Sequence, residues 1–432
     1  MTHANNSVNG WTTRKLRECL VGLDSGSRPS GGAESGRGEV FSLGGEHIDD
    51  EGCFDFSNAQ FVPLSHYEAI KAEADVAVGD ILINKDGAKT GKVALVRPGF
   101  PFSPCCINEH VFRLRARNET IEGDYLFYYL VGHEGQGQIA CNVQGSAQGG
   151  INRTFAKHVF VPQPESRDER RAIVGLLDQV EDAIQAKRLE MIAAQRLKTA
   201  LMQQLFTRGI PGRHTKFKQN KIGKIPVEWD VVTLGSLAEI DAGVALNPER
   251  EPRSNGYRYL TVVNVQRERI DLSEVRHLEL WDSEIPGKLL KEGDIVAVEG
   301  HANSSEIGRA AMVSAQASGM AFQNHLFRVR LRPEVGFNSR FLLGCMNSER
   351  VRRHWNATAN TSSGLNTINR RGLRKLLVPQ PRRSEQDDIV ALINSANANI
   401  GAAESELLAV RRLKTSLLQN LLTGKVRVKM ET

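Results

Sequence analysis

Basic and amide side chains gather in two polar loops, each between segments with the β-branched alternation of strands. Gly79–Val96 contains Lys85, Lys89 and Lys92 in or beside its loop, and Gly293–Val313 contains His301, Asn303, Ser304, Ser305 and Arg309. Such side chains bind DNA bases or phosphates. The bracketing glycines stand 12 positions apart in the first loop and 15 in the second. A polar loop of variable length in a shared frame favours base reading, although a solvated hairpin tip explains any single residue equally well.

Two further sets of basic residues are DNA-binding candidates. Arg153 and Arg370 end an Ile-Asn-Arg triplet that occurs in both halves of the chain. A shared arginine cannot distinguish two sequences, so a phosphate contact or a structural role fits better than base reading. Arg350, Arg352, Arg353 and His354 form a basic cluster in the second half, and a solvated helix face is the more common meaning of such a cluster.

Enzymatic chemistry is not indicated. Gly87–Lys92, GAKTGK, is one residue shorter than the phosphate-binding loop GxxxxGK and is followed by Val93 instead of Ser or Thr. The chain has no H-E-x-x-H motif, and its six cysteines form no C-x-x-C pair. We therefore predict no catalytic residue and no metal site, and we expect the cysteines to be reduced thiols.

A repeat indicates how the chain positions these loops. RLKTALMQQLFT at 196–207 returns as RLKTSLLQNLLT at 412–423, a shift of 216 in 432 residues. A shift of half the length predicts a tandem duplication of the whole chain. HVFRLR at 110–115 and HLFRVR at 325–330 are also repeated, as is VPQP at 161–164 and 378–381. Amphipathic helices are expected over 124–140 and 338–356.

A long helix is predicted after each VPQP segment. Ser166 and Glu169 have the spacing of a capping box, and no proline follows before residue 207. Apolar residues then recur at alternating steps of three and four, which is typical of a coiled coil. The predicted seam comprises Ile173, Leu177, Val180, Ile184, Leu201, Leu205, Ile389, Ile393, Ile400, Leu407, Leu417 and Leu421. Lys198 and Lys414 interrupt it at equivalent places, either to fix the register or to extend to the helix surface.

These patterns predict an α+β fold with two pseudo-two-fold-related α/β lobes, separated by an antiparallel two-helix coiled coil of roughly 60 Å. The expected segments are a first lobe at 1–165, a first helix at 166–210, a second lobe at 211–382, a second helix at 383–424 and a basic tail at 425–432. The net charge of +6 and the pI near 9.0 permit a nucleic-acid partner. With neither a signal peptide nor a transmembrane run, we expect a cytoplasmic protein.

The ordered, duplicated motifs resemble the specificity subunits of type I restriction-modification systems. That resemblance implies two target recognition domains that read a bipartite asymmetric double-stranded DNA sequence with a fixed spacer. It also implies a non-catalytic chain that docks two methyltransferase (modification) subunits and is joined by restriction/translocase subunits. S-adenosylmethionine, ATP and Mg would then be bound by the partner subunits. One departure is Arg170, because such helices usually begin Glu-Gln, as at Glu385-Gln386.

Two alternatives remain open. The chain could be the specificity subunit of a related type II restriction-modification system, or a coiled-coil scaffold that binds only proteins. DNA binding in the presence of a methyltransferase partner would separate the scaffold from the other two.

Overall fold

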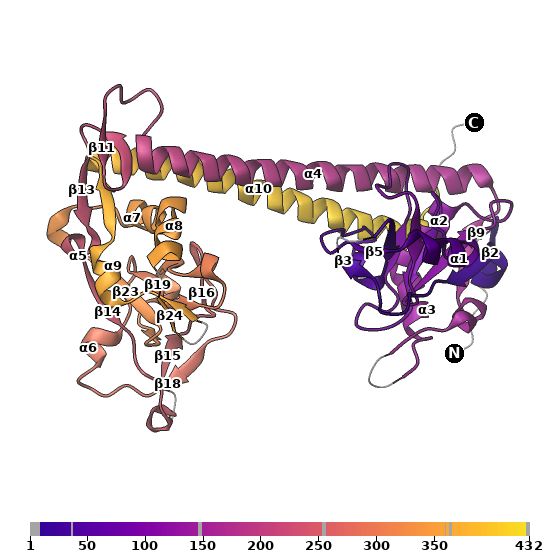
Figure 1. Ribbon diagram of the computed structural model, residues 1–432, viewed down its shortest axis with the longest axis horizontal. Helices are drawn as coiled ribbons and strands as arrows, with labels where there is room; N and C mark the ends of the chain where they lie inside the picture. Colours follow the sequence, from indigo (N-terminus) through magenta and orange to yellow (C-terminus); the bar gives the residue numbers. More distant parts are fainter. Residues whose placement is uncertain are drawn as a thin grey trace. The chain divides into compact units, whose positions relative to one another are not determined.

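The computed structural model describes residues 9–35, 38–145, 149–252, 256–358, 360–362 and 365–428, and the chain forms two compact units (Figure 1). The first unit contains residues 1–189 and 404–432, and the second contains residues 190–403. Each unit therefore combines one globular segment with one half of each long helix. No described helix is long and apolar enough to cross a membrane.

Each unit has a central four-stranded antiparallel sheet, and the two sheets have the same strand order. The first has the order β2-β9-β6-β7, with bounds Leu20–Ser25, Val111–Ala116, Ile81–Asn84 and Val93–Leu95. The second has the order β14-β23-β19-β21, with bounds Ala238–Ala242, Leu326–Leu331, Ile295–Val298 and Ala310–Met312. This agreement confirms the mixed α/β architecture that the tandem duplication predicts.

The repeated HVFRLR and HLFRVR segments are β9 and β23, which lie inside these sheets. Their first arginines are buried and pair with an aspartate on the neighbouring strand, Arg113 with Asp24 at 2.9 Å and Arg328 with Asp241 at 2.8 Å. Their second arginines bind Asp80 and Asp294, two residues that each accept a backbone N–H at the preceding turn. Because a buried charge must be paired, the buried guanidinium groups of the first arginines and the buried carboxylates of Asp80 and Asp294 explain why both arginines recur in the two copies.

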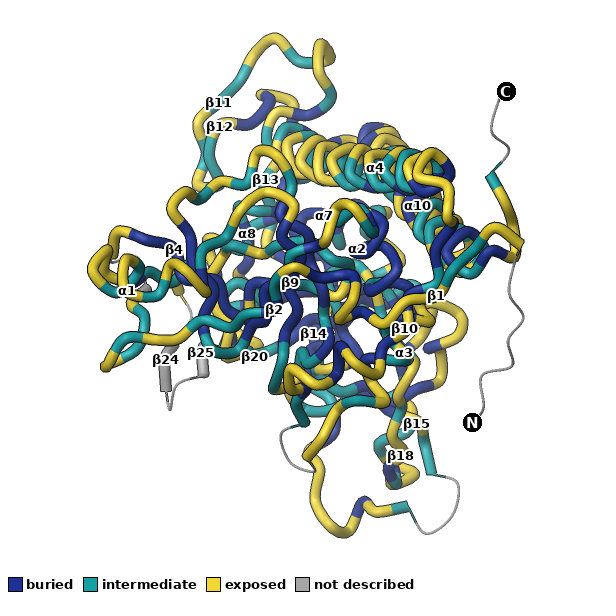
Figure 2. The backbone as a smooth tube through the Cα atoms, turned by 90° about the vertical axis from the view of Figure 1, so that its right-hand side faces the viewer, coloured by how far each residue is buried: buried dark blue, intermediate teal, exposed yellow. Residues whose placement is uncertain are grey.

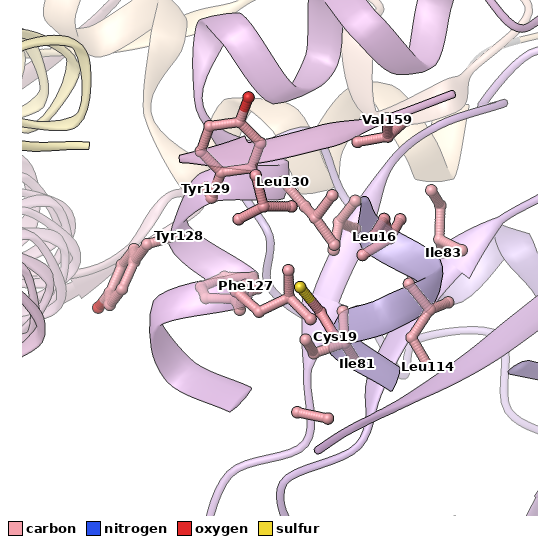
Figure 3. Close-up of a cluster of buried hydrophobic side chains, with 14 of the residues drawn as sticks. Leu16, Cys19, Ile81, Ile83, Leu114, Phe127, Tyr128, Tyr129, Leu130 and Val159 are labelled. Carbon is pink, nitrogen blue, oxygen red and sulfur yellow. The ribbon is translucent and has the colours of Figure 1, made fainter. Parts of the chain in front are cut away.

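The core of the first unit lies between the central sheet and α2 (Gly123–Val131). Phe127, Tyr128 and Leu130 come from α2 and lie near Leu16, Ile81 and Leu114 (Figure 3). The second unit has a matching core between its sheet and α7 (Ser339–Asn347). All six cysteines are free, and burial raises the pKa of Cys19 to about 11, as expected for structural thiols.

The helices predicted at 124–140 and 338–356 are each two helices, so that prediction was wrong. α2 is followed by α3 (His133–Ala140), and α7 is followed by α8 (Glu349–Thr358). Gly132 and Ser348, which are 216 residues apart, separate them with extended backbone. The turn brings α3 against the end of α2, where a Cβ at Gly135 would stand 2.1 Å from the Tyr129 carbonyl oxygen.

Smaller sheets and short helices complete both units. The first unit has β1 (Trp11–Lys15) paired with β10 (Phe160–Pro164), the sheet β3 (Glu34–Ser35), β5 (Gln60–Val62), β4 (Val40–Leu43) and β8 (Cys105–Ile107), and α1 (Leu64–Ala74). In the second unit, β13 (Asp230–Thr233) pairs with β26 (Leu377–Gln380). A separate three-stranded sheet has the order β18 (Arg276–Leu278), β15 (Tyr257–Leu260) and β22 (Ala321–Phe322). The short helices of this unit are α5 (Leu234–Leu237), α6 (Ile285–Lys288) and α9 (Arg370–Lys375). It also has β16 (Val265–Gln266) with β17 (Arg269–Ile270), β20 (Gly300–His301) with β25 (Leu365–Thr367) and β24 (Asn360–Ser362), and the hairpin β11 (Phe217–Asn220) and β12 (Gly223–Pro226).

The two long helices are α4 (Arg167–Arg208) and α10 (Arg383–Leu421). In the first unit they run antiparallel, because Glu181 pairs with Lys414 and Lys187 pairs with Glu406, each at 2.6 Å. Each predicted seam residue on these helices is buried or half-buried. The pairing of two long helices is therefore confirmed.

Both seam lysines reach a carboxylate. Lys414 pairs with Glu181 on the other long helix, whereas Lys198 pairs with Glu268 of the second lobe at 2.6 Å. The repeat explains the difference, because the residue equivalent to Glu181 is the neutral Asn397. Burial acts to raise the pKa of Glu181, but Lys414 outweighs it and the pKa is lowered. Neither lysine simply extends to solvent.

A buried carboxylate at the start of each long helix is bound by a basic residue that follows the end of the other. Glu385 accepts from His214 Nε2 at 2.7 Å and from Trp229 Nε1 at 3.0 Å. Glu169 accepts from Arg427 at 2.5 and 2.6 Å. Of the predicted capping box, the bond from the Glu169 N–H to Ser166 Oγ is present at 3.3 Å, but the Glu169 side chain is taken up by Arg427.

Candidate DNA interface

The first polar loop connects β6 to β7 as an antiparallel hairpin, and its lysines hold neighbouring segments. Lys85 Nζ lies 3.4 Å from Ser25 Oγ and 5.3 Å from the centre of the Phe112 ring. Lys89 donates to the carbonyls of Glu46 and Ile48 at 2.8 and 3.1 Å, and Lys92 pairs with Asp50. All three lysines are half-buried. Their DNA contacts remain predictions, and the loop's bonds to 46–50 give these lysines a second, structural role.

The Ile-Asn-Arg triplet lies beside the loop in both units. The Ile151 N–H donates to the Lys85 carbonyl at 2.7 Å, and the Ile368 N–H donates to the Glu299 carbonyl at 2.9 Å. Asn152 and Asn369 are the N-caps of the next short helices, 153–157 and α9. The isoleucine and asparagine of the triplet are therefore explained by structure. Of the preceding loops, residues 146–148 and 363–364 lie outside the described residues.

The two arginines of the triplet have different surroundings. Arg370 pairs with Asp241 at 3.0 Å, an aspartate that also binds Arg328. Arg153 is exposed and has no side-chain partner among the described residues. Asp24, the counterpart of Asp241, binds Arg113 instead. A phosphate contact is therefore open to Arg153 directly, whereas Arg370 would share its charge with Asp241.

The second polar loop exposes small polar side chains. Asn303 and Ser304 are exposed, and the Asn303 Oδ1 caps the turn 304–306 by accepting from the Ser305 N–H at 3.0 Å. His301 is half-buried in β20, and its Nδ1 accepts from the Asn303 N–H. The Asn303 side-chain NH₂ thus remains available as a donor to a base edge.

Arg309 does not fit the prediction of a DNA contact. It is buried, and its guanidinium donates to the Val262 carbonyl at 3.0 Å and pairs with Glu306 at 3.4 Å. Buried guanidinium groups act on neighbouring protein atoms, so Arg309 positions the loop. The polar loop and the Ile-Asn-Arg triplet therefore lie together in each unit, and Arg309 holds the loop in place through its bonds to Val262 and Glu306.

Three pairs of apolar residues are exposed at equivalent positions of the two long helices. Their exposed fractions are 39% for Leu176 and Leu392, 40% and 49% for Ile192 and Leu408, and 69% and 49% for Leu197 and Leu413. Leu197 and Leu413 belong to the repeated RLKT segments. Sequence periodicity identifies only the apolar residues that face inward, so it missed this surface. A comparison of the two copies reveals it, because apolar residues recur at the same outward positions.

Comparison with known proteins shows which proteins this chain is similar to. Residues 39–194 match the model of the type I restriction modification DNA specificity domain. The type I restriction enzyme MjaVIII specificity subunit of Methanocaldococcus jannaschii is 24% identical over 373 residues, covering 86% of this chain and 83% of that protein. This chain is therefore similar to type I specificity subunits over most of its length. The StySPI specificity subunit of Salmonella potsdam is a further relative, 22% identical over 374 residues, with coverage of 86% and 78%.

Solved structures share this fold. A chain from work on complex assembly and conformational transition of the type I restriction-modification system superposes with a TM-score of 0.63 at 15% identity, covering 97% of this chain and 99% of that one. The type I system S subunit from M. genitalium has a TM-score of 0.50 at 12% identity, with coverage of 99% and 98%. Within the described residues, no cluster of His, Cys, Asp and Glu could hold a metal ion.

Proposed function

We propose that this chain is the DNA sequence-recognition subunit of a type I restriction-modification complex and has no catalytic site of its own. The observation that carries the proposal is the duplicated unit, in which one sheet order supports two polar loops of different length and composition. Similar frames with different loops suit a bipartite target, one half-site per unit. The continuous helices α4 and α10 would set the spacer between the half-sites.

Each loop would read its half-site with different chemistry. In the first unit the lysines donate only, which favours guanine O6 and N7 or phosphates. In the second unit the free Asn303 amide group and the hydroxyl of Ser304 suit adenine or mixed base edges. Arg153 and Arg370 would contact phosphates, which position the duplex without adding sequence information.

The repeated leucine surface would dock two methyltransferase subunits, one on each copy. Two partners of identical sequence need two similar surfaces, and the exposed pairs at 176/392, 192/408 and 197/413 supply the same apolar groups twice. Restriction/translocase subunits would join this complex, and S-adenosylmethionine, ATP and Mg would be bound by the partners. The proposed target, host and invading DNA, would place the complex in the cytoplasm.

Docking can be tested by counting partners. Leu197→Glu and Leu413→Glu, made in the full chain co-expressed with its methyltransferase, should each leave one methyltransferase per chain, and the double variant should leave none. The mass of the purified complex, measured by analytical ultracentrifugation, reports the number. Leu189→Glu is the matched control, because Leu189 is 68% exposed but its counterpart is Ser405. Two methyltransferases on the double variant would refute this docking surface.

Sequence recognition is tested by mapping methylated bases in a host with and without this gene. We expect methylation at one asymmetric sequence with two defined halves and an unspecified spacer. Replacing residues 301–308 by the corresponding loop of a relative should change only one half. Methylation independent of this gene would contradict the proposal, and DNA methylation or cleavage by the purified chain alone would contradict its non-catalytic role. Protein partners without any DNA binding would favour the scaffold.

A further inference from the structure

A basic surface of the second unit lies outside both the polar loop and the triplet. It consists of the β11–β12 hairpin and the outer face of α8, and we call it the hairpin–helix patch. Its members are Lys216, Lys218, Lys221, Lys224, Arg352 and Arg353. The segment 215–227 contains these four lysines and no acidic residue. Among the described residues, the patch forms ion pairs only with Glu349, which binds both arginines.

The hairpin presents its lysines to solvent. Lys216, Lys221 and Lys224 are exposed, and Lys218 is half-buried. The hairpin β11–β12 is drawn mostly in the exposed and intermediate colours in Figure 2. Lys218 Nζ donates to the Val227 carbonyl at 2.9 Å, and Lys224 Nζ lies 5.7 Å from the centre of the Phe217 ring. These contacts orient two of the ammonium groups but neutralise neither. The hairpin therefore carries four positive charges, and within the part of the chain that the structure describes none of them forms an ion pair with a carboxylate.

A small cavity joins the hairpin to α8. Its volume is about 250 Å³, and its lining includes Ile222 at the hairpin turn, Arg350 and Arg353 from α8, and Thr207 at the end of α4. Hydroxyl and amide groups of Ser348 and Gln203 also line it. The hairpin turn and α8 thus line the same recess, which Glu349, the partner of Arg352 and Arg353, also lines.

The other side of α8 supports the second polar loop. Trp355 is buried, and a Cβ at Gly308 would stand 2.6 Å from its Nε1. α8 also lies against the turn 304–306, which contains Ser304. The patch is therefore continuous with the elements that position the candidate base-reading residues of this unit.

The two arginines of the patch have uncharged counterparts in the first unit. Positions 136 and 137 of α3, the counterparts of Arg352 and Arg353, are Gln and Gly. In the sequence, residues 1–10 contain neither Lys nor Arg, whereas Lys425 and Arg427 follow α10, and Arg427 pairs with Glu169. The charge at the α8 positions of the patch therefore differs between the copies and is not required by the shared fold.

We propose that the hairpin–helix patch binds the sugar–phosphate backbone of the DNA beside the half-site read by the second unit, adding affinity without sequence information. This inference rests on the proposed function. Duplex DNA carries about one negative charge per 1.7 Å, which suits a surface of unpaired lysines. Lysine acts as a point charge toward phosphate, so neither base identity nor a shaped pocket is required.

The test measures how DNA affinity depends on salt for the full chain assembled with its methyltransferase. The variants are K216Q/K221Q/K224Q and R352Q/R353Q, and the control is K15Q/K71Q/K425Q, three exposed lysines of the first unit. Each lost phosphate contact lowers the slope of log K against log salt by about 0.9, so the hairpin variant should lose roughly 2–3. The control should keep the wild-type slope, and K216R/K221R/K224R should restore it.

Two duplexes separate this inference from the proposed function. One carries the methylated target, and the other carries it with one half-site altered. The hairpin variant should bind both more weakly by the same factor. A wild-type slope in both patch variants would overturn the inference, as would a changed discrimination between the duplexes. Loss of a protein subunit at unchanged slope would instead identify an acidic protein as the ligand and also overturn it. If the wild-type complex does not discriminate between the duplexes, the proposed function itself fails.

Discussion

Replacing Arg170 by Gln tests how the first unit holds the start of its long helix. Arg170 donates to Glu122 at 2.7 Å and to the Pro164 and Glu165 carbonyls at 2.8 and 3.1 Å. In the second unit, Gln386 donates to the Pro381 carbonyl at 3.0 Å and accepts from the Asn338 N–H at 2.8 Å. Residues 122 and 338 are equivalent, as are 170 and 386. The Glu122–Arg170 ion pair therefore stands where the Gln386 side chain binds the backbone N–H of Asn338 in the second unit.

Each single substitution should be costly, and the double substitution should not. Arg170→Gln deprives Glu122 of its better-buried partner and leaves it with Arg167, whose side chain is 55% exposed. A hydrogen bond to a charged group contributes about 1.5–3 kcal/mol, so we expect a loss of about 2–3 kcal/mol. Glu122→Asn leaves a buried guanidinium with carbonyls only, at a similar cost. The double variant reproduces the Asn–Gln arrangement and should lose about 1 kcal/mol or less, which gives a coupling of roughly 3–5 kcal/mol.

Urea titration combined with pulsed hydrogen exchange would measure these free energies, because peptides from α2 and α7 report each unit separately. Only the first unit should respond, so the second serves as an internal control. Additive single effects would refute the reasoning, since they would show that Arg170 and Glu122 act independently.

The pH dependence gives an independent check on the same pair. Burial acts to raise the pKa of Glu122, but Arg170 and Arg167 outweigh it, so the pKa is lowered in the folded chain. A carboxylate with a lowered pKa stabilises the fold above its ordinary pKa of about 4.3, and this stabilisation is lost as the pH falls. The wild type should therefore lose more stability on acidification than the double variant, which lacks the carboxylate.

Three further predictions concern the long helices. Lys414→Met should destabilise the first unit by about 1–3 kcal/mol in urea titration. The loss should be largest at neutral pH, because the lowered pKa of Glu181 depends on Lys414. A urea midpoint equal to that of the wild type would show that this ion pair does not stabilise the unit. Glu385→Ala should cost the second unit about 3–5 kcal/mol, since it removes the acceptor of both His214 and the buried Trp229 indole, whereas Glu385→Gln should cost less because it keeps an acceptor for the indole. Inserting seven residues after Leu189 and after Ala403 should lengthen the DNA spacer by about 10 Å, roughly three base pairs, with methylation mapping as the readout; an altered half-site would contradict a spacer set by the helices.

Repeats and periodicity predicted the elements that both copies share. The two long helices, the strand pairs around each polar loop and the inward seam follow from binary patterns that local residues determine. The helix breaks at Gly132 and Ser348 were missed, because the apolar pattern continues across them and the turn is set by packing of α3 and α8 on their neighbours. The helix propensity of the residues alone does not predict a helix break that is caused by tertiary contacts.

The candidate site was less predictable, because the function of a cation depends on its neighbours. Arg309 and Lys89 look alike as exposed loop cations in the sequence, yet the structure commits both to backbone carbonyls. Arg153 and Arg370 look equivalent, yet of the two only Arg370 pairs with a carboxylate, Asp241, among the described residues. Comparing the two copies position by position would have identified such differences, since Asn397 in place of Glu181 changes the partner of Lys198.

The repeated RLKT segments illustrate how one short motif serves two surfaces. The lysine of the motif points inward in both copies. Lys198 pairs with Glu268 and Lys414 pairs with Glu181, so both copies keep the lysine although the carboxylate that binds it differs. Its leucine turns outward, and Leu197 and Leu413 remain exposed in both copies. An exposed leucine contributes little to folding, so agreement at this position points to a shared external partner. Inward identity thus reflects the paired helices, whereas outward identity is what the proposed docking of two partners requires.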